Sequence, residues 1–223
     1  MKRLTVLFIL AFASINILTA QDDKVQFGFI FGASTPSDNI AQIYNQDRFS
    51  SDSLTGDGTI VNDALSTGYH LGARIRLKLT DNAYFIGGFS WHRFPTNTMY
   101  MMHPETNDTI ASFENTTNII PINAGINFYL IQSVVGVYAT ADLTYNMIST
   151  STDYKYKKLD IPITDLELDP QDSRLGFGVG AGVDFNILFT GNLEVKYNYT
   201  NLIGKDDDEK DKAYLSVSLG IYF

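Results

Sequence analysis

The last eleven residues of the chain alternate strictly between two kinds of side chain. From Ala213 to Phe223 the sequence reads A-Y-L-S-V-S-L-G-I-Y-F, with an apolar residue at every odd number and a tyrosine, serine or glycine at every even number. Successive side chains of a strand point to opposite faces, so this segment predicts a strand with one apolar and one polar face. Because chain ends usually fray, a patterned strand that runs to its final aromatic residue favours an end held in a closed sheet.

Other segments of the chain repeat this alternation. The segment from Ala83 to Phe94 loses it around Gly87 and Gly88 and is assigned as a strand by its position. Eight strands are predicted: Val25–Ser34, Tyr69–Leu79, Ala83–Phe94, Ile120–Tyr129, Val135–Tyr145, Leu175–Phe185, Leu193–Tyr199 and Ala213–Phe223.

The connections between the predicted strands are unequal in an ordered way. Three are short: Thr80–Asn82, Ile131–Ser133 and Leu188–Gly191. They alternate with four long ones: Pro36–Ser66, Pro95–Thr117, Ser149–Asp172 and Asn201–Lys212. This arrangement predicts an all-β, eight-stranded, antiparallel, up-and-down transmembrane barrel with short periplasmic turns and long extracellular loops. Weak alternation in Thr96–Met102 and Thr109–Glu114 indicates that the second hairpin extends beyond the membrane.

The first twenty residues have the organisation of a secretory signal peptide. A basic start, Met1-Lys2-Arg3, precedes an apolar run that ends in Leu18-Thr19-Ala20, where cleavage is expected. The domain prediction is therefore a signal peptide over 1–20 and a barrel domain over 21–223. The chain has no cysteine, so an exported domain needs a stabilising device other than a disulfide. Its formal net charge of −9 argues against nucleic acid as a partner.

Three observations favour a membrane barrel over a secreted lipocalin-like binder, in which the apolar face would point inward. Glycines occupy the polar face of one strand from Gly176 to Gly182, which suits the crowded interior of a small barrel. Acidic residues concentrate in the long connections. Aromatic residues mark both ends of the apolar face, as expected of a girdle: Phe85, Phe128, Phe185 and Phe223 toward the short turns, and Tyr69, Trp91, Tyr145 and Tyr199 toward the long loops.

The polar face carries charged residues that would lie in the barrel lumen. They are His70, Arg74, Arg76 and Lys78 on the second strand, with Asp142, Asp184, Glu194 and Lys196 on the fifth to seventh. Buried charges need partners, so Arg74 and Arg76 are expected to pair with the carboxylates and to plug the lumen. The alternative is a narrow ion path lined by the same residues.

Catalytic and metal sites have weaker support. Ser90 and His92 share one strand face, as a barrel lipid hydrolase would need, but no neighbour in the sequence supplies a group to orient the histidine. The three histidines, His70, His92 and His103, lack metal-ligand spacing, and Lys205–Lys212 is interpreted as a solvated loop. Neither a cofactor nor a metal is expected.

Several of these segments resemble a known family. The strand Asn118–Leu130, the glycine-alternating Leu175–Asp184 and the terminal Ser216–Phe223 are similar to the OmpA/OmpX-like outer-membrane β-barrel proteins of Gram-negative bacteria, often termed the porin family. The resemblance covers essentially the whole chain after residue 20. It implies that Leu219, Ile221 and Phe223 form the signal read by the barrel-assembly machinery. The family's usual glycine five residues before the terminal aromatic is Ser218 here, with Gly220 displaced.

The functional prediction is a small, non-enzymatic outer-membrane barrel with a structural or surface-interaction role. Expected partners are outer-membrane lipids, lipopolysaccharide and, during biogenesis, the assembly machinery; a monomer is expected, and the partner of the loops is not specified by the sequence. The alternatives are a narrow channel, a barrel lipid hydrolase acting through Ser90 and His92, and a secreted lipocalin-like binder.

Overall fold

The computed structural model describes residues 25–36, 59–62, 67–102, 109–156, 171–205 and 211–223. The predicted signal peptide and His103 lie outside the described residues. Nine strands are present in the described part of the chain: β1 (Val25–Pro36), β2 (Thr59–Asn62), β3 (Gly68–Lys78), β4 (Ala83–Met102), β5 (Thr109–Ile131), β6 (Val135–Tyr156), β7 (Gln171–Asn186), β8 (Thr190–Ile203) and β9 (Ala213–Tyr222).

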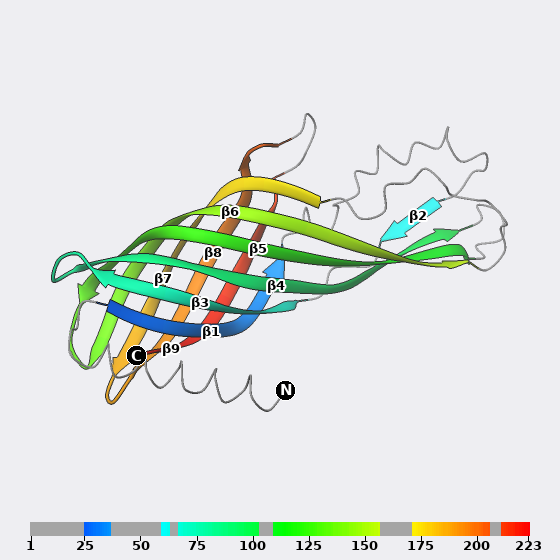
Figure 1. Cartoon of the computed structure of the whole chain (residues 1–223). Helices are drawn as coiled ribbons and strands as arrows, with labels where there is room; N and C mark the ends of the chain where they lie inside the picture. The colour runs from blue at the N-terminus through cyan, green and yellow to red at the C-terminus, as the bar shows by residue number, and fades with distance from the viewer. Residues whose placement is uncertain (1–24, 37–58, 63–66, 103–108, 157–170, 206–210) are drawn as a thin grey trace, which may run out of the picture.

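Eight of these strands form a closed antiparallel barrel, and the short β2 pairs with the far end of β4 (Figure 1). Consecutive barrel strands pair with each other along the chain, and β1 pairs with both β3 and β9, which closes the ring. The closure brings Phe29 opposite Ile221 and Ala33 opposite Val217. The predicted eight-stranded up-and-down barrel, closed between its first and last strands, is confirmed.

The three short turns lie together at one end of the barrel, which we term the turn end, and the strand ends that the long connections join lie at the other, the loop end (Figure 1). Strands β4, β5 and β6 run well past the loop end of the other strands. Their backbones stay paired from Asn97 opposite Asn115 and from Thr150 opposite Thr117 outward. The predicted loop Pro95–Thr117 is therefore mostly hairpin, as its weak alternation indicated, and the predicted loop Pro36–Ser66 contains β2.

Side-chain exposure alternates along the barrel strands with the predicted parity. Leu143, on the apolar row of β6, is 70% exposed, whereas its neighbours Asp142 and Thr144 are buried. The same contrast separates the outward Phe31 from the inward Ile30 and Ser34 on β1. Most of the inward row is polar, so the barrel carries its apolar surface on the outside. This is the reverse of a lipocalin-like binder.

The inward glycines of β7 allow strands and side chains to approach closely. A Cβ atom built on Gly182 would lie 2.3 Å from the ring of Tyr138, and one built on Gly176 would lie 2.0 Å from the carbonyl oxygen of Tyr199. A Cβ on Gly178 would lie 2.6 Å from a carboxylate oxygen of Asp142. These positions have no room for a larger residue, as predicted for a filled interior.

Among the described residues, no helix is long and apolar enough to cross a membrane.

Candidate functional site

The interior of the barrel is the first candidate site, and its layer nearest the turn end is built around Arg76. Arg76 comes from β3 and is fully buried. Its Nη1 lies 2.7 Å from Oδ2 of Asp184 on β7. The guanidinium carbon lies 3.7 Å from the ring centroid of Tyr222, a distance at which a cation is attracted to the ring face. Tyr129 donates a hydrogen bond to the same Asp184 oxygen, and Asn192 donates one to Oδ1 at 2.7 Å.

A second ion pair lies one step further along the polar row of β3. Arg74 donates a hydrogen bond from Nη1 to Oε2 of Glu194 at 2.9 Å, and its Nη2 lies 2.8 Å from Oε1 in a salt bridge. The hydroxyl of Tyr138 donates to Oε2 of Glu194 at 2.9 Å and accepts a hydrogen bond from Asn192. Because Asn192 also contacts Asp184, Tyr138 and Asn192 link the two ion pairs into one network.

A third ion pair joins β8 to β6, and two further cationic side chains, Arg174 and Lys212, are also buried. The Nζ of Lys196 on β8 lies 2.7 Å from Oδ2 of Asp142 on β6, and Asn123 donates to the same oxygen at 3.3 Å. The three pairs balance three buried cations against three buried carboxylates. The Arg76–Asp184 and Arg74–Glu194 pairs join strands that are distant in the ring, so these side chains bridge the interior from wall to wall. The Lys196–Asp142 pair joins strands that are separated by one strand.

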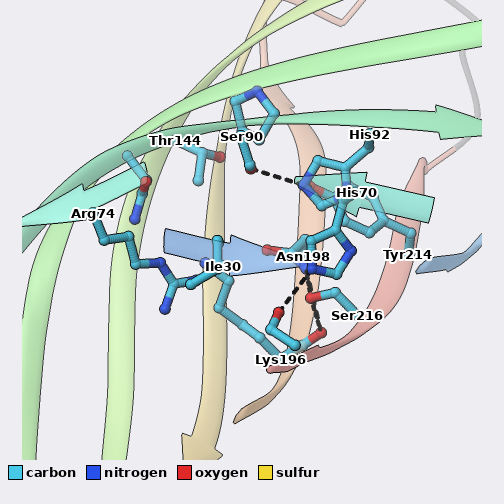
Figure 2. A pocket seen from close by; sticks show the side chains of 13 residues that line it. Ile30, His70, Arg74, Ser90, His92, Thr144, Lys196, Asn198, Tyr214 and Ser216 are labelled. Carbon is cyan, nitrogen blue, oxygen red and sulfur yellow. Dashed lines mark hydrogen bonds between the residues drawn. The ribbon is translucent and has the colours of Figure 1, made fainter. Parts of the chain in front are cut away.

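A chain of hydrogen bonds between serines and histidines links the adjacent strands β9, β1, β3 and β4 above these pairs, toward the loop end. Figure 2 shows its bond between Ser90 and His92. Ser34 on β1 is bonded to Nδ1 of both His70 and His92, at 2.9 and 2.8 Å. The Nε2 atoms of these histidines reach Ser218 and Ser90, at 2.9 and 2.8 Å. The two imidazole rings stack with centroids 4.7 Å apart.

The single hydroxyl proton of Ser34 couples the tautomers of the two histidines. A neutral imidazole has one N–H donor and one acceptor nitrogen. When Ser34 donates to Nδ1 of His70, His92 must donate from its own Nδ1, so the proton positions of both rings are fixed together. The reverse arrangement is equally complete. The five groups therefore satisfy each other only as a unit.

An apolar cluster lies in the interior on the loop side of the histidines. It consists of Phe94, Ile119, Ile148 and Tyr214, all buried. Tyr214 contacts both layers, because its ring lies 4.8 Å from that of His92 and 5.7 Å from that of Phe94. Below the cluster lies a small cavity lined by His70, His92, Arg74, Lys196 and neighbouring polar groups (Figure 2). The volume open to the centre of a water molecule is about 10 Å³. That space accommodates about one water molecule.

Most of the charged residues singled out in the sequence come together in this interior, and one does not. Lys78 is exposed at the end of β3 and pairs with Asp81 in the following turn at 3.1 Å. Its assignment to the lumen is wrong, because the strand ends there and its side chain has left the ring. His70 is in the interior but bonds to serines rather than to a carboxylate.

Sequence reasoning missed the tyrosines and serines that connect the charges. Tyr129, Tyr138 and Tyr222 are buried and surround Arg76, and Ser34 joins the histidines. A signal was present, because all four occupy the polar parity of their strands. Tyrosine at that parity in a narrow barrel has nowhere to lie but among the inward charges.

The geometry around Ser90 is unsuited to lipid hydrolysis. Ser90 is hydrogen-bonded to His92, as nucleophilic catalysis would require. The group on the other imidazole nitrogen, however, is the hydroxyl of Ser34 and not a carboxylate. Both Ser90 and His92 are buried in the interior, on the side of the barrel wall away from the apolar outer face. Among the described residues, no group of three or more histidine, aspartate or glutamate side chains is placed to hold a metal ion.

The predicted girdle residues all lie on the outward row. The rings of Tyr69 and Trp91 make an edge-to-face contact with centroids 5.8 Å apart. The indole N–H of Trp91 donates to Oδ1 of Asn118 at 3.2 Å. Tyr199 stacks on Phe177. All eight predicted girdle residues are exposed or half-buried: Tyr69, Phe85, Trp91, Phe128, Tyr145, Phe185, Tyr199 and Phe223.

The second candidate site is the part of the sheet that projects past the loop end, which we term the extended sheet. It comprises β2, residues 97–102 of β4, residues 109–117 of β5 and residues 150–156 of β6. At about 3.4 Å per residue, residues 109–117 project by roughly 30 Å. The pairing of β6 with β7 ends where Ser149 meets Gln171, so β6 has no paired neighbour beyond this point on that side within the described residues.

The connection after β8 carries its own ion pair, outside the barrel wall. Lys205 contacts Asp211 across this connection. The hydrogen bond from Lys205, followed by one from Tyr199, lowers the pKa of the Asp211 carboxyl.

Fold and interior together define a class of protein. A closed barrel that exposes its apolar face and fills its interior with paired polar groups is built to cross a membrane, where every backbone group must be paired. The chain belongs to the outer membrane protein beta-barrel domain family, whose model matches residues 5–223. The predicted family is therefore confirmed.

The chain is also similar to solved structures, one of which, Neisserial surface protein A, has a TM-score above 0.5 and shows the same fold. Neisserial surface protein A is 16% identical, with a TM-score of 0.51 over 89% of this chain and 95% of that chain. The N-terminal β-barrel domain of OprF from Pseudomonas aeruginosa is 13% identical, with a TM-score of 0.44 over 91% of this chain and 100% of that chain. Ail, the attachment invasion locus protein of Yersinia pestis, is 12% identical, with a TM-score of 0.43 over 90% of this chain and 99% of that chain. No curated protein matches the sequence.

Proposed function

We propose that the protein is a small, non-enzymatic outer-membrane barrel whose interior is a polar plug and whose role is structural or interactive at the cell surface. The turn end faces the periplasm and the loop end faces outside. The observation that carries the proposal is the interior, where three buried ion pairs join non-adjacent strands. They follow one another along the barrel, below a buried apolar cluster. An interior occupied in this way favours a role at the outer ends of the strands over transport through the barrel.

Recording from planar lipid bilayers tests the plug. The wild-type protein is expected to show no stable ion conductance. Because Arg76 and Asp184 fill the turn-end layer and Arg74 and Glu194 the next, truncating all four to alanine is expected to open small conductances. A stable, ion-selective conductance of the wild type would contradict the plug and favour the alternative of a narrow channel.

The surface role is placed on the extended sheet. Paired backbone that projects by roughly 30 Å offers a rigid edge, and an exposed edge can accept a strand from a partner. Replacing residues 97–115 by an Asn-Gly turn would remove the β4–β5 part of this sheet without touching the barrel interior. Cells that display this variant are expected to keep folded barrel in the outer membrane and to lose adhesion to surfaces or to each other. Unchanged adhesion would leave only the structural role.

The lipid hydrolase alternative has a direct test. If Ser90 were a nucleophile, Ser90→Ala would abolish any change in lipid A or phospholipid composition caused by the protein. We expect identical lipid profiles from cells that express the wild type, Ser90→Ala or no protein. Because Ser90 and His92 are buried among interior hydrogen bonds, their expected role is to hold β4 against β1 and β3.

The proposed partners follow from the outer surface. Outer-membrane lipid covers the apolar row, and lipopolysaccharide meets the girdle and the acidic connections at the loop end. Leu219, Ile221 and Phe223 all point outward from the last strand, where the assembly machinery would read them. A monomer is proposed, since ring closure leaves no barrel edge to pair with a second copy.

A further inference from the structure

Two of the three short turns at the turn end carry a concentration of exposed apolar side chains. The β5–β6 turn spans Leu130–Val135 and the β7–β8 turn spans Asn186–Thr190, and we term them the linked turns. Leu188 at the tip of the β7–β8 turn is 95% exposed. The exposed apolar residues of the two turns are Leu130, Ile131, Val134, Val135, Ile187, Leu188 and Phe189.

The linked turns satisfy many of their polar groups among themselves. The backbone N–H of Asn186 donates to the carbonyl of Val134 at 2.8 Å, and its side-chain amide donates to the carbonyl of Ser133 at 3.2 Å. Thr190 donates to the side-chain oxygen of Asn186, and Ser133 donates to the carbonyl of Val135, both at 2.8 Å. Such pairing is what a turn in an apolar medium needs. The β3–β4 turn is paired in the same way, since the N–H groups of Leu79 and Thr80 donate to the carbonyl of Ala83, so the pairing permits immersion of the linked turns without requiring it.

The third short turn, between β3 and β4, has the opposite character. It spans Leu79–Asn82. Leu79 is exposed, but the other three residues, Thr80, Asp81 and Asn82, are polar, and Asp81 is almost fully exposed beside Lys78. The linked turns contain no charged residue. The turn end is therefore divided into an apolar side, below β5 to β8, and a charged side, below β3 and β4.

The apolar side is continuous with the outer surface of the barrel wall. Phe128 on β5 and Phe185 on β7 are exposed on the outward row directly before the linked turns. The apolar belt therefore does not stop at the strand ends on this side, but wraps around the rim of the barrel.

We propose that the linked turns are immersed in the lipid leaflet at the turn end, with acyl chains as the occupant of their apolar surface. The barrel then sits deeper in this leaflet on the β5–β8 side, and the β3–β4 turn stays at the aqueous surface. Lipid is the occupant that the belt already meets, and no charge has to be desolvated to extend that contact over the rim. The inference is independent of whether the interior conducts.

Site-directed spin labelling can measure this immersion directly, because the chain has no cysteine and every introduced thiol is unique. The full chain carrying Leu188→Cys would be labelled with a nitroxide and folded into vesicles of phosphatidylethanolamine and phosphatidylglycerol. Asn82→Cys on the charged turn is the matched control. Val134→Cys provides a second position on the linked turns should Leu188→Cys fold poorly. Heat-modifiable migration establishes that each variant has folded.

The readout is collision of the nitroxide with oxygen, which concentrates in acyl chains, against collision with a water-soluble nickel chelate. We expect the labels at Leu188→Cys and Val134→Cys to collide several-fold more with oxygen than with the chelate, and the label at Asn82→Cys to show the reverse ratio. A folded protein whose Leu188→Cys and Val134→Cys labels prefer the nickel chelate would overturn the proposal. Equal protection from both reagents would also overturn it, because it would indicate cover by protein.

Discussion

The most informative single residues are the buried charges, because each pairs with a residue on a strand that is not its neighbour in the ring. Arg74 and Glu194 are separated by 120 positions in the sequence and form a buried ion pair. Removing one partner of a buried pair leaves an uncompensated charge, which costs far more than the pair contributes as a whole. The stability of the barrel should therefore respond strongly to single truncations and weakly to paired apolar replacement.

Glu194→Ala is expected to lower the free energy of unfolding by about 3–5 kcal/mol, because it strands Arg74 in the interior. The double variant Arg74→Met with Glu194→Leu should recover most of this loss. Urea titration of the protein folded in vesicles, followed by the shift of the folded band on unboiled gels, gives the three values. Lys78→Ala is the control, since its exposed pair with Asp81 is worth about 0–1 kcal/mol. A loss as large for Lys78→Ala as for Glu194→Ala would contradict the buried network.

At this scale the sequence located the interior charges but not their pairings. Parity alone places Arg74 and Arg76 inside, whereas the choice between Asp184 and Glu194 depends on the stagger of the strands around the ring, which no local pattern encodes. Parity also failed for Lys78, because it is the last residue of β3, where the side chain is exposed and pairs with Asp81 of the following turn. The Ser34 bridge was unpredictable for a related reason, since it needs β1, β3 and β4 in register.

Among the strands, β7 is shaped by what packs against its glycines. The ring of Tyr138 lies over Gly182 and is held there by its hydrogen bonds with Glu194 and Asn192. Gly182→Ala is expected to destabilise the barrel by about 1–3 kcal/mol, because a pinned, fully buried ring must shift. The matched control is Gly191→Ala, where the nearest atom would be 3.9 Å away and the expected change is within about 0.5 kcal/mol. Equal unfolding midpoints for the two variants would refute this packing.

The last strand is held to the first by its terminal residue as well as by the ladder. Phe27 and Phe223 exchange two backbone hydrogen bonds, of 3.0 and 2.9 Å. Deleting Phe223 removes both bonds and the outward aromatic ring, so we expect less folded, heat-modifiable protein in outer-membrane fractions. Phe223→Ala separates the two contributions, because it keeps the backbone and loses the ring. A normal yield for the deletion would show that neither closure nor the terminal aromatic limits assembly.

The existence of these strands was predictable, and weak alternation indicated the extension of β4 and β5 past the loop end. The extension of β6 to Tyr156 was not predicted. Within the membrane one face meets lipid and the other meets a packed interior, so alternation is enforced and readable. Past the loop end, β4, β5 and β6 have no lipid on one side, and the parity rule lapses although the backbone stays paired. The same loss of constraint hid β2 inside a predicted loop.

The whole molecule is organised by an inversion: its exposed surface is apolar and its interior is polar. Leu143, midway along β6 and 70% exposed, shows what this inversion requires. In a soluble protein, replacing so exposed a leucine by arginine would change stability by no more than about 0.5 kcal/mol. On the lipid face of a barrel, the same change at the bilayer midplane costs about 2–4 kcal/mol, and near the interface only about 0–1 kcal/mol.

We therefore expect Leu143→Arg to destabilise the folded protein in vesicles by about 2–4 kcal/mol. Tyr145→Arg, two residues nearer the loop end on the same row, is expected to cost clearly less, because its side chain reaches the interface. Urea titration of both variants in the same vesicles gives the comparison. Near-neutral values at both positions would mean that this face meets water. A gradient from Leu143 to Tyr145 would instead show that Leu143 lies deeper in the bilayer than Tyr145, as expected if Tyr145 belongs to the aromatic girdle at the loop end.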